Sequence, residues 1–272
     1  MASSTYIACT RMYNVCESVA VLWDKLLVTT SRISGIPVRI ERHPFPQDIQ
    51  TLWDRDDLGL TFICGRAFVL EGMRHTAIAA PLRLRSDGGA PSALYNTVIL
   101  VREDSPYRNV SDILSARIGW TVFHSHSGYL AAKRLLTEAA AGADVSRLFT
   151  GETGPLHTPV NCIRALHSGK VDAAPLDGYC HELLLRSKPE ALAGTRVLAA
   201  TREYPMPFLA ASPQVDTATC DALREGLFAA AALPEMAPVL AELRLAGFVL
   251  PDVTAYPILA EPGEMQPALG HG

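Results

Sequence analysis

The residues whose types and spacing suggest chemistry form one short polar stretch, Ser125, His126 and Ser127. Residues 118–123, just before it, make a mostly apolar run that is typical of a buried strand. From Gly128 onward apolar residues recur every three or four positions, which predicts an amphipathic helix. The polar stretch therefore lies at a helix N-terminus, where unpaired backbone amides and the helix dipole favour an anion.

These serines have a simpler interpretation, because capping a helix needs only one serine side chain. Two further residues favour the anion site. His157 precedes a second predicted helix, which has Thr158 as its N-cap and ends near Gly169, and Asp177 follows a predicted strand over 171–176. Since parallel strands of an α/β sheet end at one common edge, we expect these loops and the serines to converge there.

The elements that position these residues follow an α/β pattern. The first part of the chain predicts a strand over 5–9, a helix over 15–30, and strands over 38–41 and 58–63. Tyr13 and Gly65 come directly after the first and third of these strands, so we expect both at the carboxyl edge of the sheet.

Two such strand and helix series predict an α/β protein with two lobes and two hinge crossings. The first lobe is predicted over 1–101 and 203–272, and the second over 102–202. The crossings are expected near residues 98–103 and 200–207. Helices are predicted at about 217–233 and 236–246, packed on the first lobe, and the Pro- and Gly-rich tail beyond Pro257 is predicted to trail over the surface.

Composition excludes several functional classes. The 272 residues are 49% hydrophobic and carry a net charge of −4, with no basic cluster interleaved with aromatic residues, so no nucleic-acid partner is expected. No run is long and apolar enough to span a membrane, and no secretory signal is visible. The six cysteines lack CxxC spacing, so we interpret them as reduced and buried, and we expect no metal and no cofactor.

Several short motifs, taken in order, resemble one family. They are RMYN, Trp53, DLGLTFICG, LYNTVILVREDS, SHSGYLAAKRLL, Leu156-His157, SGKVDAAPLD and YPMP. Together they cover roughly residues 5–235 and resemble the phosphate- and phosphonate-binding type of ABC-transporter substrate-binding protein. That family is a branch of the type 2 periplasmic binding fold.

The resemblance implies a two-lobed protein that closes on a phosphorus oxyanion (phosphate, phosphite or alkylphosphonate) in the interlobe cleft, without catalysis. It implies a transporter permease as partner and a periplasmic location, although the missing signal leaves the cytoplasm open. It also implies ligand contacts from eight positions: Tyr13, Gly65, Tyr95, Ser125, His126, Ser127, His157 and Asp177. Tyr95 is assigned with Tyr13 and Gly65 to the first lobe.

The sequence departs from the family pattern at three places. His126 stands where a small hydroxyl residue is usual, Arg66 where an aromatic residue is expected, and Phe208-Leu209 where aminoalkylphosphonate binders have a carboxylate. An amine-bearing ligand is therefore disfavoured. Two other functions stay open: a cytosolic ligand sensor of the same fold, and a hydrolase with serine, His157 and Asp177 as its triad, although FHSHSG is not the GxSxG elbow.

Overall fold

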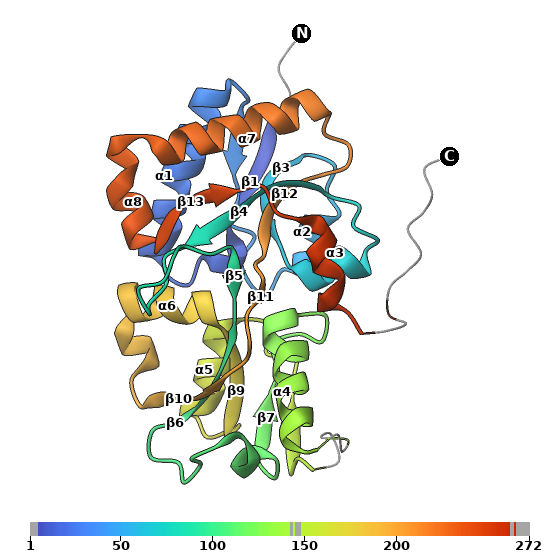
Figure 1. Cartoon of the computed structure of the whole chain (residues 1–272), viewed down its shortest axis with the longest axis vertical. Helices are drawn as coiled ribbons and strands as arrows, with labels where there is room; N and C mark the ends of the chain where they lie inside the picture. The colour runs from blue at the N-terminus through green and yellow to red at the C-terminus, as the bar shows by residue number, and fades with distance from the viewer. Residues whose placement is uncertain (1–4, 142–143, 145–147, 262–263, 265–272) are drawn as a thin grey trace. The chain divides into compact units, whose positions relative to one another are not determined.

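The computed structural model describes residues 5–141, 144, 148–261 and 264. The chain forms two compact units, one over 1–94 and 205–272 and the other over 95–204. It passes from one unit to the other in the short strands β5 (Leu94–Tyr95) and β11 (Tyr204–Pro205), which pair with each other (Figure 1). The predicted α/β fold with two lobes and two crossings is confirmed.

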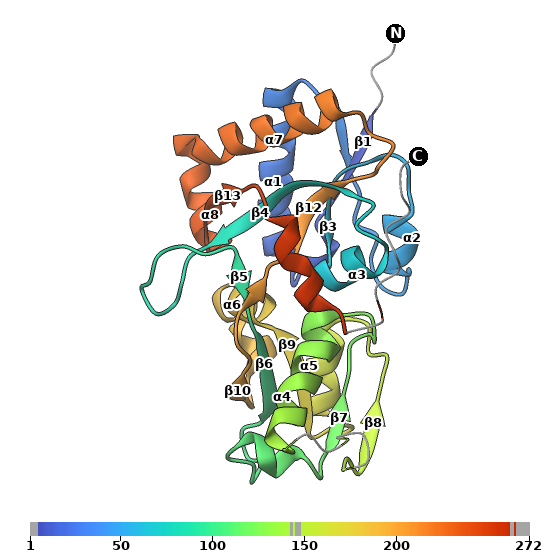
Figure 2. The ribbon, with the colours of Figure 1, turned by 45° about the vertical axis from the view of Figure 1, so that its right-hand side comes forward.

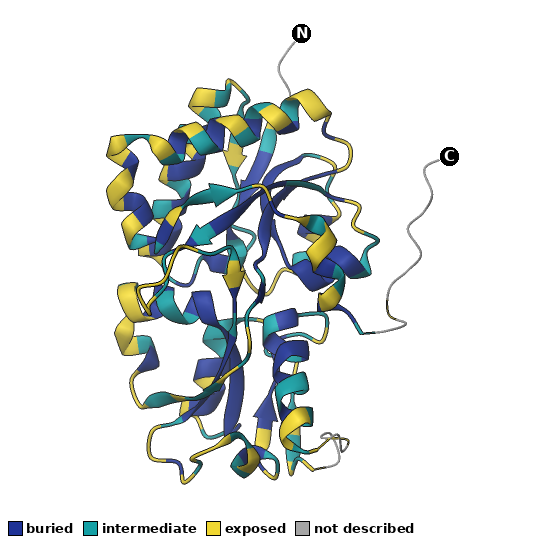
Figure 3. Ribbon diagram, viewed as in Figure 1, coloured by how far each residue is buried: buried dark blue, intermediate teal, exposed yellow. Residues whose placement is uncertain are grey.

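The first unit is built on a six-stranded sheet of order β13-β4-β12-β3-β1-β2. The strands β1, β2 and β3 are parallel, while β12 returns antiparallel between β3 and β4. The strand bounds are β1 (Tyr6–Cys9), β2 (Val38–Ile40), β3 (Leu58–Ile63), β4 (Thr76–Arg83), β12 (Phe208–Ala211) and β13 (Leu245–Val249). Every residue of β3 is buried, as expected for a central strand covered on both faces (Figure 3).

Helices cover this sheet because each carries one apolar stripe. In α1 (Glu17–Ser34) the buried positions recur at helical spacing, and α1 lies against α7 (Thr217–Ala232) (Figure 2). Both α7 and α8 (Ala237–Glu242) pack on the first unit, as predicted. The predicted extension of the last helix to residue 246 is wrong, because Arg244 adopts a left-handed φ of 56° and Leu245 begins β13. Two short helices, α2 (Ile49–Trp53) and α3 (Gly65–Leu70), flank β3 in sequence.

The second unit repeats the same plan with a five-stranded sheet of order β10-β6-β9-β7-β8. Here β7, β8 and β9 are parallel and β6 runs antiparallel between β9 and β10. The strands are β6 (Thr97–Arg102), β7 (Arg117–Gly119), β8 (Gly151–Thr153), β9 (Ala173–Asp177) and β10 (Thr195–Ala200). The helices are α4 (Ala131–Ala139), α5 (Pro159–His167) and α6 (Gly178–Ser187).

The division of the chain differs from the predicted boundaries at both crossings: residues 203–204, predicted in the first lobe, belong to the second unit, and the first crossing lies at residues 94–95 rather than near 98–103. The prediction placed residues 95–101, and so Tyr95, in the first lobe, whereas the structure places them in the second unit. The reason is that β6 pairs on both sides with strands of that unit, with Thr97 opposite Asp177 and Val101 opposite Arg196. A strand paired on both sides cannot belong to another sheet.

The C-terminal segment is packed rather than trailing, which corrects the prediction for residues 258–260. In the turn Val253–Leu259, Tyr256 and Leu259 are buried, and the Tyr256 hydroxyl donates to the Met206 carbonyl at 2.6 Å. Beyond it, Glu264 accepts both arms of the buried Arg66 guanidinium, at 2.8 and 2.9 Å. The Tyr256 ring also packs edge-on against Phe68 and Phe208. Both partners are distant in sequence, so the local composition of the tail did not indicate this packing.

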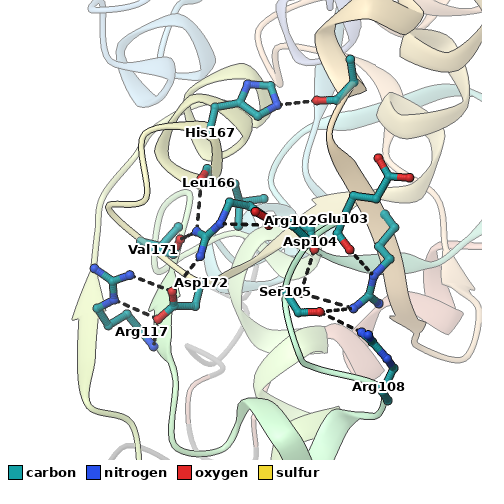
Figure 4. A network of polar contacts seen from close by, with 12 residues as sticks. Arg102, Glu103, Asp104, Ser105, Arg108, Arg117, Leu166, His167, Val171 and Asp172 are labelled. Atoms are coloured by element: carbon teal, nitrogen blue, oxygen red, sulfur yellow. Dashed lines mark hydrogen bonds and ion pairs between the residues drawn. The ribbon is translucent and has the colours of Figure 1, made fainter.

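A polar network lies at the C-terminal end of β6, opposite the end that begins at Thr97. Asp172 accepts from the Arg117 amide at 3.0 Å and from its guanidinium at 2.8 and 2.7 Å. Arg102 lies 3.5 Å from the same carboxylate and donates to the Val171 carbonyl at 3.1 Å (Figure 4). A hollow of about 490 Å³ lies beside this network, lined by Arg102, Glu103, Asp104, His167 and Gly194. It lies at the sheet edge away from Asp177, because β6 and β9 are antiparallel.

Candidate functional site

The serine stretch forms the N-terminus of a helix, as predicted, but its first turn is π-helical. Ser125 is the N-cap, with extended backbone, and its hydroxyl accepts the Gly128 amide at 2.9 Å. The turn His126–Leu130 then leads into α4, and the Leu130 amide donates to the Ser125 carbonyl at 3.3 Å. A π turn delays the first internal hydrogen bond by one residue, so the amides of Ser127 and Tyr129 precede any acceptor within the helix.

Gly128 allows this turn to lie directly on Thr121. A Cβ added at Gly128 would overlap the Thr121 hydroxyl and would lie 2.7 Å from the Thr121 Cβ. The Thr121 amide donates to the Gly128 carbonyl at 3.2 Å, which ties the loop after β7 to the helix start. The close approach requires glycine, so Gly128 sets where the amides around it lie.

Asp177 lies beside the serines, as the strand-edge argument predicted. Its carboxylate caps α6 by accepting the amides of Tyr179 and Cys180 at 2.9 and 3.1 Å. The Ser127 hydroxyl lies 3.4 Å from the other carboxylate oxygen, close enough to donate to it. Asp177 is 7% exposed, so its charge is stabilised mainly by these donors and the α6 N-terminus.

The His126 side chain is buried and contacts Tyr95 and Tyr204, the first and last residues of the second unit. Its Nδ1 and the Tyr95 hydroxyl share a hydrogen bond of 3.1 Å, and its ring meets the Tyr204 ring edge-on at 4.4 Å. Arg202 stacks over the same Tyr204 ring. His126 is 1% exposed, so its imidazole supports Tyr95 from behind rather than facing solvent at the tip.

His157 is held next to the same loop by backbone contacts. Its amide donates to the Thr121 carbonyl at 2.9 Å, and the Leu156 amide donates to the Trp120 carbonyl at 2.9 Å. The residue is exposed and adopts a left-handed φ of 67°, an unusual conformation for a residue with a side chain. Thr158 caps α5 at Oγ1 and Pro159 begins that helix, as predicted. His157 therefore lies between two fixed backbone segments.

The two first-unit candidates are both buried. Tyr13 is inaccessible and meets Phe62 edge-on at 4.8 Å. Gly65 begins α3 beneath the C-terminal turn, where an added Cβ would lie 2.5 Å from Leu259 and 2.7 Å from Tyr256. The C-terminal turn thus covers the tip of β3, which the sequence prediction did not anticipate.

Three residues near the serines escaped the sequence analysis: Thr97, Thr121 and Tyr204. The Thr97 hydroxyl donates to the Ser127 carbonyl at 3.2 Å, and the Thr97 amide donates to the Thr201 hydroxyl at 3.0 Å. Of these three, only Thr121 could have been suspected from the sequence, because a glycine in the first turn of a helix, here Gly128, often marks the close approach of another segment. The residue that approaches Gly128 is Thr121.

The arrangement offers donors rather than a nucleophile. Ser125 caps the helix. The Ser127 hydroxyl contacts the Asp177 carboxylate directly, whereas a catalytic triad has a histidine between its serine and its carboxylate. Hydroxyl and amide donors grouped at a helix start suit an anion that is bound and not attacked.

The cysteines are free thiols, and burial raises the pKa of Cys9 to about 11 and that of Cys162 to about 12. None of the described residues forms a cluster of three or more metal-ligating side chains.

Comparison with known proteins shows the family to which the chain belongs. A family model for periplasmic substrate-binding proteins of phosphonate ABC transporters matches residues 16–256. A comparison with curated proteins gives no significant match. In the described part of the chain, no helix has the length and apolar character needed to cross a membrane.

Solved structures share the fold along nearly the whole chain. The binding component of an ABC phosphonate transporter from Pseudomonas aeruginosa is 19% identical, with a TM-score of 0.77 over 94% of this chain and 84% of that one. PhnD1 from Prochlorococcus marinus, solved with methylphosphonate, is 17% identical, with a TM-score of 0.72 over 93% and 94%. A Xanthomonas citri protein solved with ATP is 22% identical, with a TM-score of 0.62 over 94% of each chain.

Proposed function

The chain belongs to the family of periplasmic substrate-binding proteins of ABC phosphonate transporters, and on that premise we propose what it binds and where. The ligand is a small phosphorus oxyanion: phosphate, phosphite or an alkylphosphonate. It is held at the serine tip of the second unit, by Ser125, Ser127, His157 and the amides of the π turn, and is released unchanged to a transporter permease.

The observation that carries this proposal is the π-helical start of α4. Its amides at Ser127 and Tyr129 have no acceptor within the helix, and the Gly128 amide is already fixed by Ser125. The helix dipole adds a favourable potential for an anion at the same place. Because Gly128, Thr121 and His157 are tied together by backbone contacts, these donors need little reordering when an anion binds.

A thermal-shift screen tests the ligand class directly. Phosphate, phosphite, methylphosphonate and sulfate would each be added to the purified protein. A ligand that binds only the folded chain raises the melting temperature. At a concentration a hundredfold above Kd it adds about 2.7 kcal/mol to the free energy of unfolding. We expect a rise with at least one phosphorus oxyanion, and phosphorus NMR should show that ligand intact after long incubation. No shift with any of them, or enzyme-dependent loss of the phosphorus signal, contradicts the proposal.

Ser127→Ala should weaken anion binding by about 1–3 kcal/mol, or roughly 5- to 150-fold, without unfolding the protein. Its hydroxyl lies 3.4 Å from Asp177, a long contact that it can exchange for one to the anion, and it caps nothing, so the helix start survives its loss. Ser125→Ala is the matched comparison, because Ser125 caps Gly128 and its loss should lower the melting temperature as well. Calorimetric titration and thermal melting of both variants separate the two roles. Wild-type affinity in Ser127→Ala would remove this serine from the site.

Asp177→Asn should improve binding of methanesulfonate relative to methylphosphonate by about tenfold, equivalent to 1.4 kcal/mol. A methylphosphonate monoanion carries a P–OH group that can donate to the Asp177 carboxylate, whereas a sulfonate has no proton and is repelled by it. Asparagine is an equally good N-cap, so α6 should keep its start. Competition titrations measure the ratio at a pH where the phosphonate is singly protonated. An unchanged ratio means that Asp177 does not face the ligand.

A further inference from the structure

His126 belongs to the serine stretch by its backbone, while its side chain lies inside the second unit. It is the first residue of the π turn and is 1% exposed. Its Nδ1 shares a hydrogen bond of 3.1 Å with the Tyr95 hydroxyl, and its ring meets the Tyr204 ring edge-on at 4.4 Å. Both tyrosines are buried residues of the same unit, so two side chains hold the imidazole in place.

The peptide bond between His126 and Ser127 carries one of the amides that the proposed site offers to the anion. Its carbonyl accepts the Ala131 amide, so this oxygen points along the helix. In a trans peptide the carbonyl and the N–H point in opposite directions, so the Ser127 amide points out of the helix start. The direction of that amide depends on the backbone angles of His126. These angles are restricted when the side chain is held, because the rotamer of a side chain and its backbone angles depend on each other.

The segment that contacts the imidazole also contacts the backbone of the turn. Thr97, two residues after Tyr95, donates its hydroxyl to the Ser127 carbonyl at 3.2 Å. The peptide units on both sides of Ser127 are thus tied to residues 95–97, one through the His126 side chain and the other directly. An amide that is fixed before the ligand arrives loses less entropy on binding, which raises affinity.

We propose that His126 is a positioning residue of the anion site, which aims the Ser127 amide without touching the ligand. It acts through its hydrogen bond with Tyr95. This inference rests on the proposed function, which places the anion at the serine tip. The sequence resemblance implies a direct ligand contact at this position, whereas a positioning role is indirect. Loss of the imidazole should therefore weaken every anion that the tip binds by the same factor.

A double-mutant cycle on anion affinity tests this role, with phosphate, phosphite and methylphosphonate as the probes. His126→Phe keeps a ring and removes the hydrogen bond, and Tyr95→Phe removes the same bond from the other side. We expect each variant to bind the anions about tenfold more weakly in calorimetric titration, and the double variant to be no weaker than either. His126→Asn keeps a polar atom near the Nδ1 position and should stay within about threefold of the wild type.

The matched control is His167→Phe, which should change none of the affinities. His167 is an exposed histidine of the same unit and lines the hollow at the sheet edge away from Asp177. Thermal melting of each variant establishes that it is folded.

Wild-type affinity in His126→Phe, or losses that multiply in the double variant, would overturn the inference. Multiplying losses would mean that Tyr95 and His126 act on the anion separately. If His126→Phe does not fold, wild-type affinity in Tyr95→Phe overturns the inference in its place. The proposed function survives each of these results as long as Ser127→Ala weakens binding. If the wild type binds none of the three anions, the inference and the proposed function fail together.

Discussion

Gly128→Ala should reduce anion affinity by about a hundredfold or more. The new methyl group would overlap the Thr121 hydroxyl and lie 2.7 Å from the Thr121 Cβ, so the helix start must move away from the loop after β7. Overpacking of this kind costs about 1–3 kcal/mol of stability. Moving the turn also misplaces at least two amide donors, each worth about 1.5–3 kcal/mol toward a charged ligand, so binding suffers more than folding does. Calorimetric titration and urea denaturation measure the two effects.

Two further variants test the cause. Thr121→Ala in the Gly128→Ala background removes the overlapping hydroxyl and should restore part of the affinity, although the Thr121 Cβ remains. Gly151→Ala, in β8 of the same unit, is the control, because its new Cβ meets only an Arg117 carbon at 3.7 Å. Full affinity in Gly128→Ala would show that the serine tip is not the anion site.

Asp172→Ala should lower the free energy of unfolding by about 3 kcal/mol, since it leaves two arginines without the carboxylate that pairs them. Asp172 accepts three hydrogen bonds from Arg117, one of them from the backbone, and its side chain is only 12% exposed. Arg117 is 45% exposed and regains some solvation, which keeps the loss at the lower end of the range for buried pairs. Urea denaturation at neutral pH measures it.

The control for this prediction is Asp104→Ala. Asp104 also faces Arg102, at 3.8 Å, but its side chain is 89% exposed, so its removal should leave stability nearly unchanged. Equal and small losses in both variants would mean that the Asp172 network contributes little. Anion binding should be unaffected in both, because Asp172 lies at the other edge of the sheet from Asp177.

The same network predicts how stability depends on acid. The hydrogen bonds from Arg117 hold the pKa of Asp172 below its usual value. A carboxyl group whose pKa is lowered by folding stabilises the protein above the pKa of the unfolded chain, about 3.9, and loses that contribution as the pH falls through the folded value. The stability difference between wild type and Asp172→Ala should therefore shrink below about pH 4.

Local sequence was sufficient wherever short-range physics decides the structure. The N-cap of Ser125, the Thr158-Pro159 helix start and the positive φ of Gly169 were predictable because caps and turns depend on neighbouring residues. The two-lobed α/β fold followed in the same way from apolar periodicity, which fixes the type of each element. Parallel strand order then placed Ser127 and Asp177 at one edge, and the structure brings them to 3.4 Å.

Long-range packing decided the rest. His126 turns away from the tip because Tyr95 and Tyr204, both distant in sequence, offer it a hydrogen bond and an aromatic contact. Gly65 is covered because Tyr256 finds its partners on α3 and β12. No local pattern encodes either contact, since the free energy of burying a side chain depends on which distant surfaces the fold brings to it. The sequence determined which elements form and at which edge the serines lie, while only tertiary packing determined which side chains are buried away from that edge.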